Sequence, residues 1–328
     1  MKVVAIGGGT GLSTVLRGLK LHVSEPSRPA QYRPEITRLT AVVTVTDEGG
    51  SSGRLRRDFR ILPPGDIRNC LVALAEDEQL LTQIFNYRFS SGHGLRGHNL
   101  GNLFLTALTN LTHDFAKAVR LSSEVLAIRG EIFPATLADV HLEATRTDGG
   151  VVRGERSITR TRVPIQRLEI VPRRCRPLPE TLAAIRQADL ITLGPGSLYT
   201  SLIPNLLVQG ISAAIARSRA VKVLICNLMT QPGESRGYSA ADHVRALHEH
   251  AGRQLFDHIV LNTTKLSGAL LKRYAAQRAA PVHMDLDAVR KLGVKPLCAP
   301  LLVEEQVARH DCRRLARLLL ALAQPRPR

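Results

Sequence analysis

The 328-residue sequence contains no tryptophan, and phenylalanine and tyrosine together make up 4% of it. Single-stranded nucleic acids are bound largely by stacking on exposed aromatic rings, and few are present. The five cysteines are an odd number without a C-x-x-C pair, which argues against a zinc site and a disulfide framework. No apolar run approaches the ~20 residues that span a bilayer, and the chain starts as a strand rather than a signal peptide. We therefore expect a soluble cytoplasmic protein.

Acidic residues are also scarce relative to basic ones. The 28 Asp and Glu face 45 Lys and Arg, which leaves a net charge of +17, and only eight of these cations are lysines. Such an excess favours nucleic acid, phosphate or an anionic membrane as a partner. Because the arginines are spread over the whole length and aromatics are few, we expect no nucleic-acid partner. An arginine-rich surface around a small anionic ligand is the preferred interpretation.

The pattern of apolar residues predicts an α/β fold. Short β-branched runs are followed by polar or glycine-containing turns and then by helical spacing, as at Leu12, Val15, Leu16 and Leu19. Strands buried on both faces and separated by helices indicate a mostly parallel, doubly wound sheet. The predicted strands are 3–6, 39–45, 189–193, 221–226 and 258–261.

The remaining segments complete one predicted domain over residues 1–328. Residues 140–171 alternate between apolar and polar and contain Asp148-Gly149, which predicts a small antiparallel β excursion with a hairpin turn. Residues 22–38 are read as a polar linker and 313–322 as an amphipathic helix. The end of the chain, 323–328, is predicted to be a flexible tail.

Two glycine-rich loops follow predicted strands. The first contains Gly8, Gly9, Thr10 and Gly11, and glycines at such a turn let backbone N–H groups approach a phosphate at a helix N-terminus. It does not match the dinucleotide fingerprint or the P-loop, and a tight turn alone is the alternative. The second loop contains Gly194, Gly196 and Ser197. Two such loops at one sheet edge favour a nucleotide crevice.

An acidic loop also follows a predicted strand. Asp47 and Glu48 could hold a ribose hydroxyl, a sugar or a divalent ion. The segment from Gly49 to Gly53, which includes Gly50, Ser51 and Ser52, is predicted to form an anion-binding nest with Arg54 nearby. A flexible surface loop is the alternative.

Three further polar segments supply candidate residues. Asp66 is a predicted N-cap of a helix with apolar positions at Leu71, Leu74 and Leu80, and Arg68 in its first turn favours a nearby anion. His98 could contact phosphate or substrate, or could cap a helix. A zinc site is not expected, because only His93 and His98 are near each other and no third ligand is close to them. The remaining candidates in these segments are Asn69, Asn99, Asn102, Asn227, Thr230 and Gln231.

Taken in order, these motifs resemble the YvcK proteins, the gluconeogenesis factor branch of the CofD-like superfamily. The resemblance runs from residue 1 to about 320 and includes 3–19, 46–53, 64–69, 97–102, 194–201, 229–234 and 309–311. It implies a Rossmann-like fold, a cytoplasmic location, and binding of UDP-sugars such as UDP-N-acetylglucosamine. It also implies a role in cell-wall synthesis and cell shape on gluconeogenic carbon sources.

The resemblance implies roles for particular residues. Gly8 to Gly11, Asp47, Gly194 to Ser197 and Asn227 would line the nucleotide crevice, while Tyr274 and Arg309 match positions associated with UDP-sugar binding. Glu48 stands where many relatives have Asp, and Cys312 where some have a phosphorylatable Thr.

Whether the protein catalyses a reaction remains open at this point. The other branch of the superfamily, 2-phospho-L-lactate transferase, uses a guanosine diphosphate adduct and Mg²⁺, and Asp47 and Glu48 are the candidate catalytic residues for such chemistry. No metal site is predicted beyond Asp47. The expected ligand is a UDP-sugar, and a cell-wall enzyme or regulator and a second copy of the chain are the candidate protein partners.

Overall fold

A parallel sheet forms the centre of the computed structural model, which describes residues 1–23 and 35–323. Its strands are β1 (Lys2–Gly7), β2 (Arg38–Val43), β3 (Glu131–Pro134), β7 (Leu190–Leu193), β8 (Val221–Ile225), β9 (His258–Asn262) and β10 (Lys295–Ala299). They lie in the order β10-β9-β8-β7-β1-β2-β3, and every neighbouring pair is parallel. The mostly parallel, doubly wound sheet is confirmed, as are all five predicted strands.

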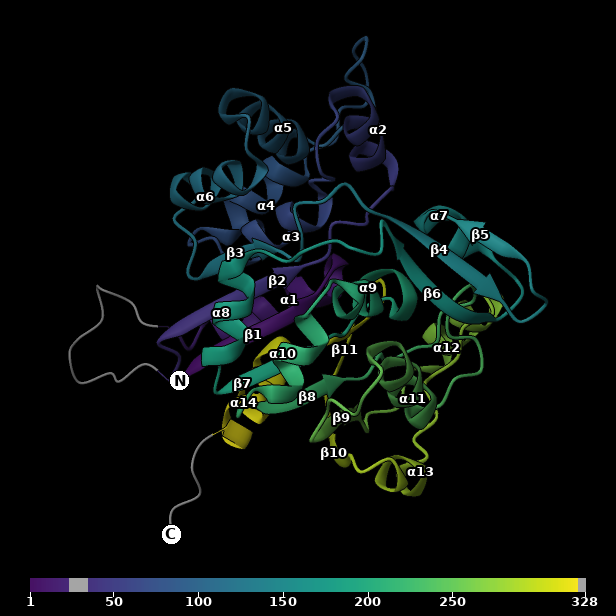
Figure 1. Ribbon diagram of the computed structural model, residues 1–328. Coiled ribbons are helices and arrows are strands. Elements are labelled where there is room, and N and C mark those ends of the chain that lie inside the picture. Colours follow the sequence, from purple (N-terminus) through teal and green to yellow (C-terminus); the bar gives the residue numbers. More distant parts are fainter. Residues whose placement is uncertain (24–34, 324–328) are drawn as a thin grey trace.

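Helices cover both faces of this sheet (Figure 1). The predicted apolar stripe of the first helix is buried, with Leu12, Val15, Leu16 and Leu19 all inaccessible to solvent. One face carries α1 (Gly9–Lys20), α3 (Gly65–Leu74) and α14 (Cys312–Ala323), and the other α8 (Pro179–Gln187), α9 (Ile203–Leu207), α10 (Ile211–Arg217) and α11 (Ala240–Ala251). Further helices are α2 (Gly50–Phe59), α4 (Glu78–Asn86), α5 (Leu100–Thr112), α6 (Phe115–Val125), α12 (Gly268–Ala276), α13 (Leu286–Lys291) and the π-helical turn η1 (Leu198–Leu202).

The sheet reverses its strand order at β1. This strand pairs with β2 on one side and with β7 on the other, so the loops after β1 and β7 leave the sheet side by side. Ligands of open α/β sheets bind at this kind of switch point, outside the carboxyl ends of the strands. Both predicted glycine loops lie there.

The antiparallel excursion lies where the sequence predicts it. Its strands are β4 (His141–Arg146), β5 (Val151–Arg153) and β6 (Ile165–Val171), and they form a separate sheet in the order β5-β4-β6. The turn is at Asp148-Gly149, where Gly149 has a φ of 82°. The sequence did not predict the short helix α7 (Glu155–Arg160) inside this segment. A second small sheet, β11 (Leu302–Glu304) and β12 (Ala308–His310), is an antiparallel hairpin.

The structure corrects three predictions around the acidic loop. Asp66 does not cap its helix, because α3 begins at Gly65 after Pro64 and Asp66 lies in the first turn. Leu80 belongs to a separate helix, α4, and is 52% exposed. The segment predicted to be an anion nest is instead the start of α2, which begins at Gly50.

The edge strands β3 and β10 were not predicted. Each contains a proline, and β10 begins with Lys295, which weakens the apolar signal that marks the central strands. The predicted linker at 22–38 falls largely outside the described residues, and the predicted tail at 323–328 falls almost wholly outside them.

Within the described ranges, no single helix has the length and apolar composition needed to cross a membrane. One bent pair, Leu198–Leu207 with Ile211–Arg217, meets those two criteria together across a 78° bend.

Candidate functional site

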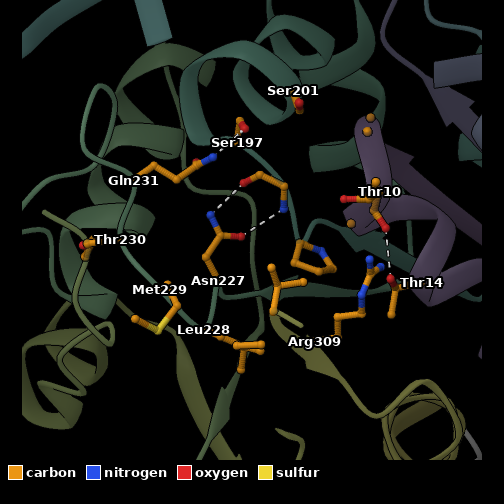
Figure 2. Close-up of a pocket in the computed structure, with 18 of the residues that line it drawn as sticks. Thr10, Thr14, Ser197, Ser201, Asn227, Leu228, Met229, Thr230, Gln231 and Arg309 are labelled. Atoms are coloured by element: carbon orange, nitrogen blue, oxygen red, sulfur yellow. Dashed lines mark hydrogen bonds between the residues drawn. The ribbon is translucent and has the colours of Figure 1, made fainter. Parts of the chain in front are cut away.

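A cleft of about 540 Å³ opens at the carboxyl ends of β1, β7 and β8. Figure 2 shows Thr10 and Thr14 of α1 on one side, Ser197 and Gln231 on another, and Arg309 reaching in from the β11–β12 hairpin. The predicted site residues that line the cleft are Gly8, Gly9, Thr10, Gly11, Asp47, Asp66, Gly196, Ser197, Asn227, Thr230, Gln231, Tyr274 and Arg309.

The two glycine loops touch each other through their backbones. A Cβ atom added to Gly11 would lie 2.1 Å from the carbonyl oxygen of Pro195, and one added to Gly8 would lie 2.6 Å from Asp66 Oδ2. A side chain at Gly11 would therefore require movement of the neighbouring loop, and one at Gly8 would require the Asp66 side chain to move. Gly194 does not line the cleft, but its φ of 85° makes the turn after β7.

Asn227 fixes the second loop. Its Oδ1 accepts a hydrogen bond from the N–H of Gly196 at 2.9 Å, and its Nδ2 donates to the Gly196 carbonyl at 2.8 Å (Figure 2). Gln231 Nε2 donates to Ser197 Oγ at 2.8 Å. The Oε1 atom of Gln231 is buried and has no partner among the described residues, so it is an acceptor available to a ligand. These bonds hold the loops after β7 and β8 in one arrangement before any ligand arrives.

Arg309 is the arginine that lines the cleft. It lies on β12, and its Nε is 3.4 Å from Glu305 Oε2. Its side chain is 38% exposed, so the guanidinium can exchange this surface ion pair for an anionic ligand at little cost. The Tyr274 hydroxyl accepts a hydrogen bond from the N–H of Ala308 at 3.0 Å. Tyr274 thus ties α12 to the hairpin residue next to Arg309.

Three carboxyl groups line one end of the cleft: Asp47, Asp66 and Glu155. Burial, and secondly the Asp47 charge, raise the pKa of Asp66 to about 7 and that of Glu155 to about 8. At neutral pH this end of the cleft therefore retains protons that ordinary carboxylates would lose. A cation or a hydrogen-bonding ligand hydroxyl placed there would relieve the repulsion between these groups.

Glu155, rather than Glu48, is the acidic partner of Asp47 in the cleft. Glu155 Oε2 accepts a hydrogen bond from the N–H of Glu48 at 2.8 Å, while the Glu48 carboxyl lies against Gly154. Sequence reasoning missed Glu155 because it lies about a hundred residues away, at the start of a helix within the β excursion. Only the packing of that excursion brings it to the cleft.

The acidic end of the cleft offers some of the oxygen ligands that Mg²⁺ prefers. Within the described part of the chain, no three His, Cys, Asp or Glu side chains are arranged to hold a metal ion together. Mg²⁺ is commonly held by one or two carboxylates together with water and substrate phosphates, and Asp47 with Asp66 or Glu155 offers such oxygen donors. The residues therefore fit a magnesium ion that arrives with a diphosphate, but not one held by protein ligands alone.

A buried polar network lies next to the acidic end of the cleft and does not line it. His98 Nδ1 is 3.0 Å from Ser51 Oγ, and Asn102 Nδ2 donates to Ser52 Oγ at 3.3 Å. Burial lowers the pKa of His98. These contacts join α2 to α5. Asn99, the residue that precedes α5, also donates a hydrogen bond from its Nδ2 to the Asn86 carbonyl at 3.2 Å.

Arg68 belongs to the same network. It donates to Asn102 Oδ1 at 3.1 Å and to Asn69 Oδ1 at 2.7 Å, and burial lowers its pKa while Asp47 and Asp66 oppose this effect. Arg68 thus places a positive charge behind the carboxyl groups. Arg54 instead donates to the Arg96 carbonyl at 2.8 Å. The predicted residues outside the cleft are Glu48, Gly50, Ser51, Ser52, Arg54, Arg68, Asn69, His98, Asn99, Asn102 and Gly194.

Comparison with known proteins shows the family to which the chain belongs. The family model of 2-phospho-L-lactate transferase CofD matches residues 3–302. The chain belongs to the CofD family. A putative gluconeogenesis factor of Nostoc is 50% identical over 97% of this chain and 68% of its own length. The gluconeogenesis factor of Bacillus subtilis is 45% identical over 98% of both chains.

A solved structure supports the same assignment. A Bacillus halodurans protein superposes with a TM-score of 0.91 at 45% identity and covers 97% of this chain and 99% of its own. Because these relatives match nearly the whole chain, this chain is a CofD-family protein of the gluconeogenesis factor group.

Proposed function

We propose that this gluconeogenesis factor homologue binds a UDP-sugar of the UDP-N-acetylglucosamine type in the cleft. The observation that carries the proposal is the pair of backbone-packed glycine loops at the β1–β7 switch point, with Arg309 lining the same cleft. The loops offer N–H groups and a helix N-terminus to a diphosphate, and Arg309 supplies a positive charge. Gln231 and Thr230 offer hydrogen-bonding atoms for a sugar or a base.

Isothermal titration with UDP-N-acetylglucosamine tests this proposal. We expect saturable binding that is at least tenfold weaker in Arg309→Ala, because a charge-assisted contact contributes roughly 1.5–3 kcal/mol. Arg313→Ala is the matched control, since Arg313 is exposed on α14 and does not line the cleft. Absence of heat at millimolar ligand, or equal weakening in both variants, would contradict the proposal.

We further propose that ligand binding regulates a cell-wall enzyme or regulator in the cytoplasm, and so supports cell-wall synthesis and cell shape on gluconeogenic carbon. Membership of the gluconeogenesis factor group supports this role. The test is complementation of a strain that lacks its own homologue, grown on a gluconeogenic carbon source. Wild type should restore growth and shape, and Arg309→Ala should not; full rescue by Arg309→Ala at equal protein levels would count against regulation through the cleft.

A second candidate function is transfer from a nucleotide-linked donor, as in 2-phospho-L-lactate transferase. The group of Asp47, Asp66 and Glu155 at the end of the cleft favours it. A bound Mg²⁺ would neutralise charge on a diphosphate; Asp47 would hold it, and protonated Asp66 or Glu155 could donate a proton to a leaving oxygen. Incubation with nucleotide-linked donors, Mg²⁺ and acceptors should give product that Asp47→Asn abolishes; no turnover by wild type would rule it out.

A further inference from the structure

A second hollow lies beside the mouth of the cleft. It has a volume of about 520 Å³ and is lined by four arginines, Arg160, Arg162, Arg236 and Arg278, together with Pro232 and Gly233. We call it the arginine hollow. Pro232 also lines the cleft, so the two depressions are neighbours that share one rim.

Three separate segments contribute to the arginine hollow. Arg160 is in the last turn of α7 and Arg162 follows it, Arg236 is in the loop after β8, and Arg278 follows α12. The loop after β8 packs directly on the end of α7, because a Cβ atom added to Gly233 would lie 1.9 Å from the Thr159 carbonyl oxygen. The positions of at least two of these segments are therefore fixed relative to each other by backbone contact.

The charge in this hollow is not compensated by the protein. No Asp or Glu lines it, and among the described residues none of its four arginines has a carboxylate partner. All four are exposed. The carbonyl groups at the end of α7 attract a positive charge and so explain the position of Arg160. They do not explain the other three arginines. Gathered like charges of this kind attract anions strongly.

The guanidinium groups and the volume of the arginine hollow indicate which class of ligand would fit. Guanidinium groups present paired N–H donors that match phosphate oxygens, and the volume is within the range of small-molecule sites. Four cations exceed what one phosphate group can contact in a bidentate manner. We propose that the arginine hollow is a second binding site, separate from the cleft, for a small ligand that carries two or more adjacent phosphate groups.

Calorimetric titration with inorganic pyrophosphate, without Mg²⁺, tests this inference. We expect saturable binding that weakens as NaCl rises from 0.05 to 0.3 M, as partly exposed charges are screened, and at least tenfold weaker binding of orthophosphate. The double variant Arg160→Gln/Arg162→Gln should lose at least tenfold in affinity. The control Arg217→Gln/Arg219→Gln removes two exposed arginines just before β8, at the amino end of this strand and away from the hollow, and should bind as wild type does.

Two further measurements separate the hollow from the cleft. Arg309→Ala and saturating UDP-N-acetylglucosamine should both leave pyrophosphate binding unchanged, whereas loss of binding in either would assign the pyrophosphate to the cleft and overturn the inference. The result is thus independent of whether a UDP-sugar binds. Equal weakening in the Arg217/Arg219 control, or no heat at millimolar pyrophosphate, would also overturn it; in the latter case an acidic protein segment becomes the candidate partner.

Arg278 can be replaced in a way that should not destabilise the fold. Its φ is +60°, a left-handed conformation at a helix end that glycine adopts more easily. Arg278→Gly should therefore weaken pyrophosphate binding at least threefold while the melting temperature stays the same or rises. Unchanged affinity in this variant would count against the proposed site.

Discussion

Close contact between the two glycine loops makes Gly11 a sensitive position. Alanine there would place a Cβ atom 2.1 Å from the Pro195 carbonyl oxygen, and a backbone atom cannot rotate away as a side chain can. We expect Gly11→Ala to destabilise the fold by about 1–3 kcal/mol and to weaken UDP-sugar binding. Gly268→Ala is the control, because a Cβ atom there meets nothing within 4 Å; it should be neutral or slightly stabilising in urea unfolding. Equal effects of both substitutions would contradict the argument.

Asp66 lines the cleft and has a raised pKa, so its charge changes near neutral pH. Its pKa is raised from 3.8 to about 7 by burial and by Asp47, so the folded state retains a proton that the unfolded state releases near pH 4. The stability linked to this proton is complete below about pH 4 and is lost as the pH rises through about 7. Asn at this position cannot ionise. Asp66→Asn should therefore gain stability relative to wild type between pH 5 and pH 8, on the order of 1–2 kcal/mol.

Urea unfolding at pH 5, 6.5 and 8 measures this gain. The control is Asp287→Asn, which removes a carboxylate that is 90% exposed on α13, and its difference from wild type should change little with pH. A difference between Asp66→Asn and wild type that is the same at all three pH values would refute the raised pKa.

At the scale of elements, the β4–β6 sheet carries Glu155 toward the cleft and is tied to α11 by His250. His250 Nε2 accepts a hydrogen bond from the N–H of Leu168 at 2.9 Å, and its Nδ1 is 2.7 Å from the Ala246 carbonyl oxygen. This arrangement requires the neutral ring with its proton on Nδ1. Burial lowers the pKa of His250, Glu249 opposes this effect, and Arg167 adds to it.

A lowered histidine pKa fixes the sign of the pH dependence. The stability that neutral His250 contributes is fully present above the unfolded pKa near 6.5 and is lost as the pH falls from there through the lower pKa of the folded state. We expect amide exchange at Leu168 to lose protection at least threefold between pH 7.5 and 5.5, after correction for intrinsic rates. Val260, in the central sheet, serves as the internal control. In His250→Gln the protection at Leu168 should not depend on pH; the same pH response in that variant would disprove the role of His250.

At the scale of the whole molecule, the net charge of +17 should oppose folding through self-repulsion. Raising NaCl from 0.02 to 0.2 M shortens the screening length, so we expect the melting temperature to rise by about 2 °C or more. Differential scanning calorimetry with NaCl at matched pH checks this. A melting temperature that falls with salt would mean that attractive ion pairs outweigh the repulsion.

The sequence by itself determined the central sheet, the antiparallel excursion and the two glycine loops. The reason is that burial of strands, helix periodicity and turn chemistry are local properties, which depend on neighbouring residues. The resemblance of the ordered motifs to the gluconeogenesis factors was equally visible and is confirmed by the relatives. The edge strands β3 and β10 were not predicted, because a strand at the edge of a sheet does not require a continuous apolar run.

Only the tertiary structure decided which polar residues meet. It brought Glu155 into the cleft and turned Glu48 toward Gly154, and it placed Ser51, His98 and Arg68 in a buried network next to the cleft. It also collected Arg160, Arg162, Arg236 and Arg278 around one hollow. Such contacts join residues far apart in the chain, and their geometry follows from how helices and sheets pack, which no local pattern records.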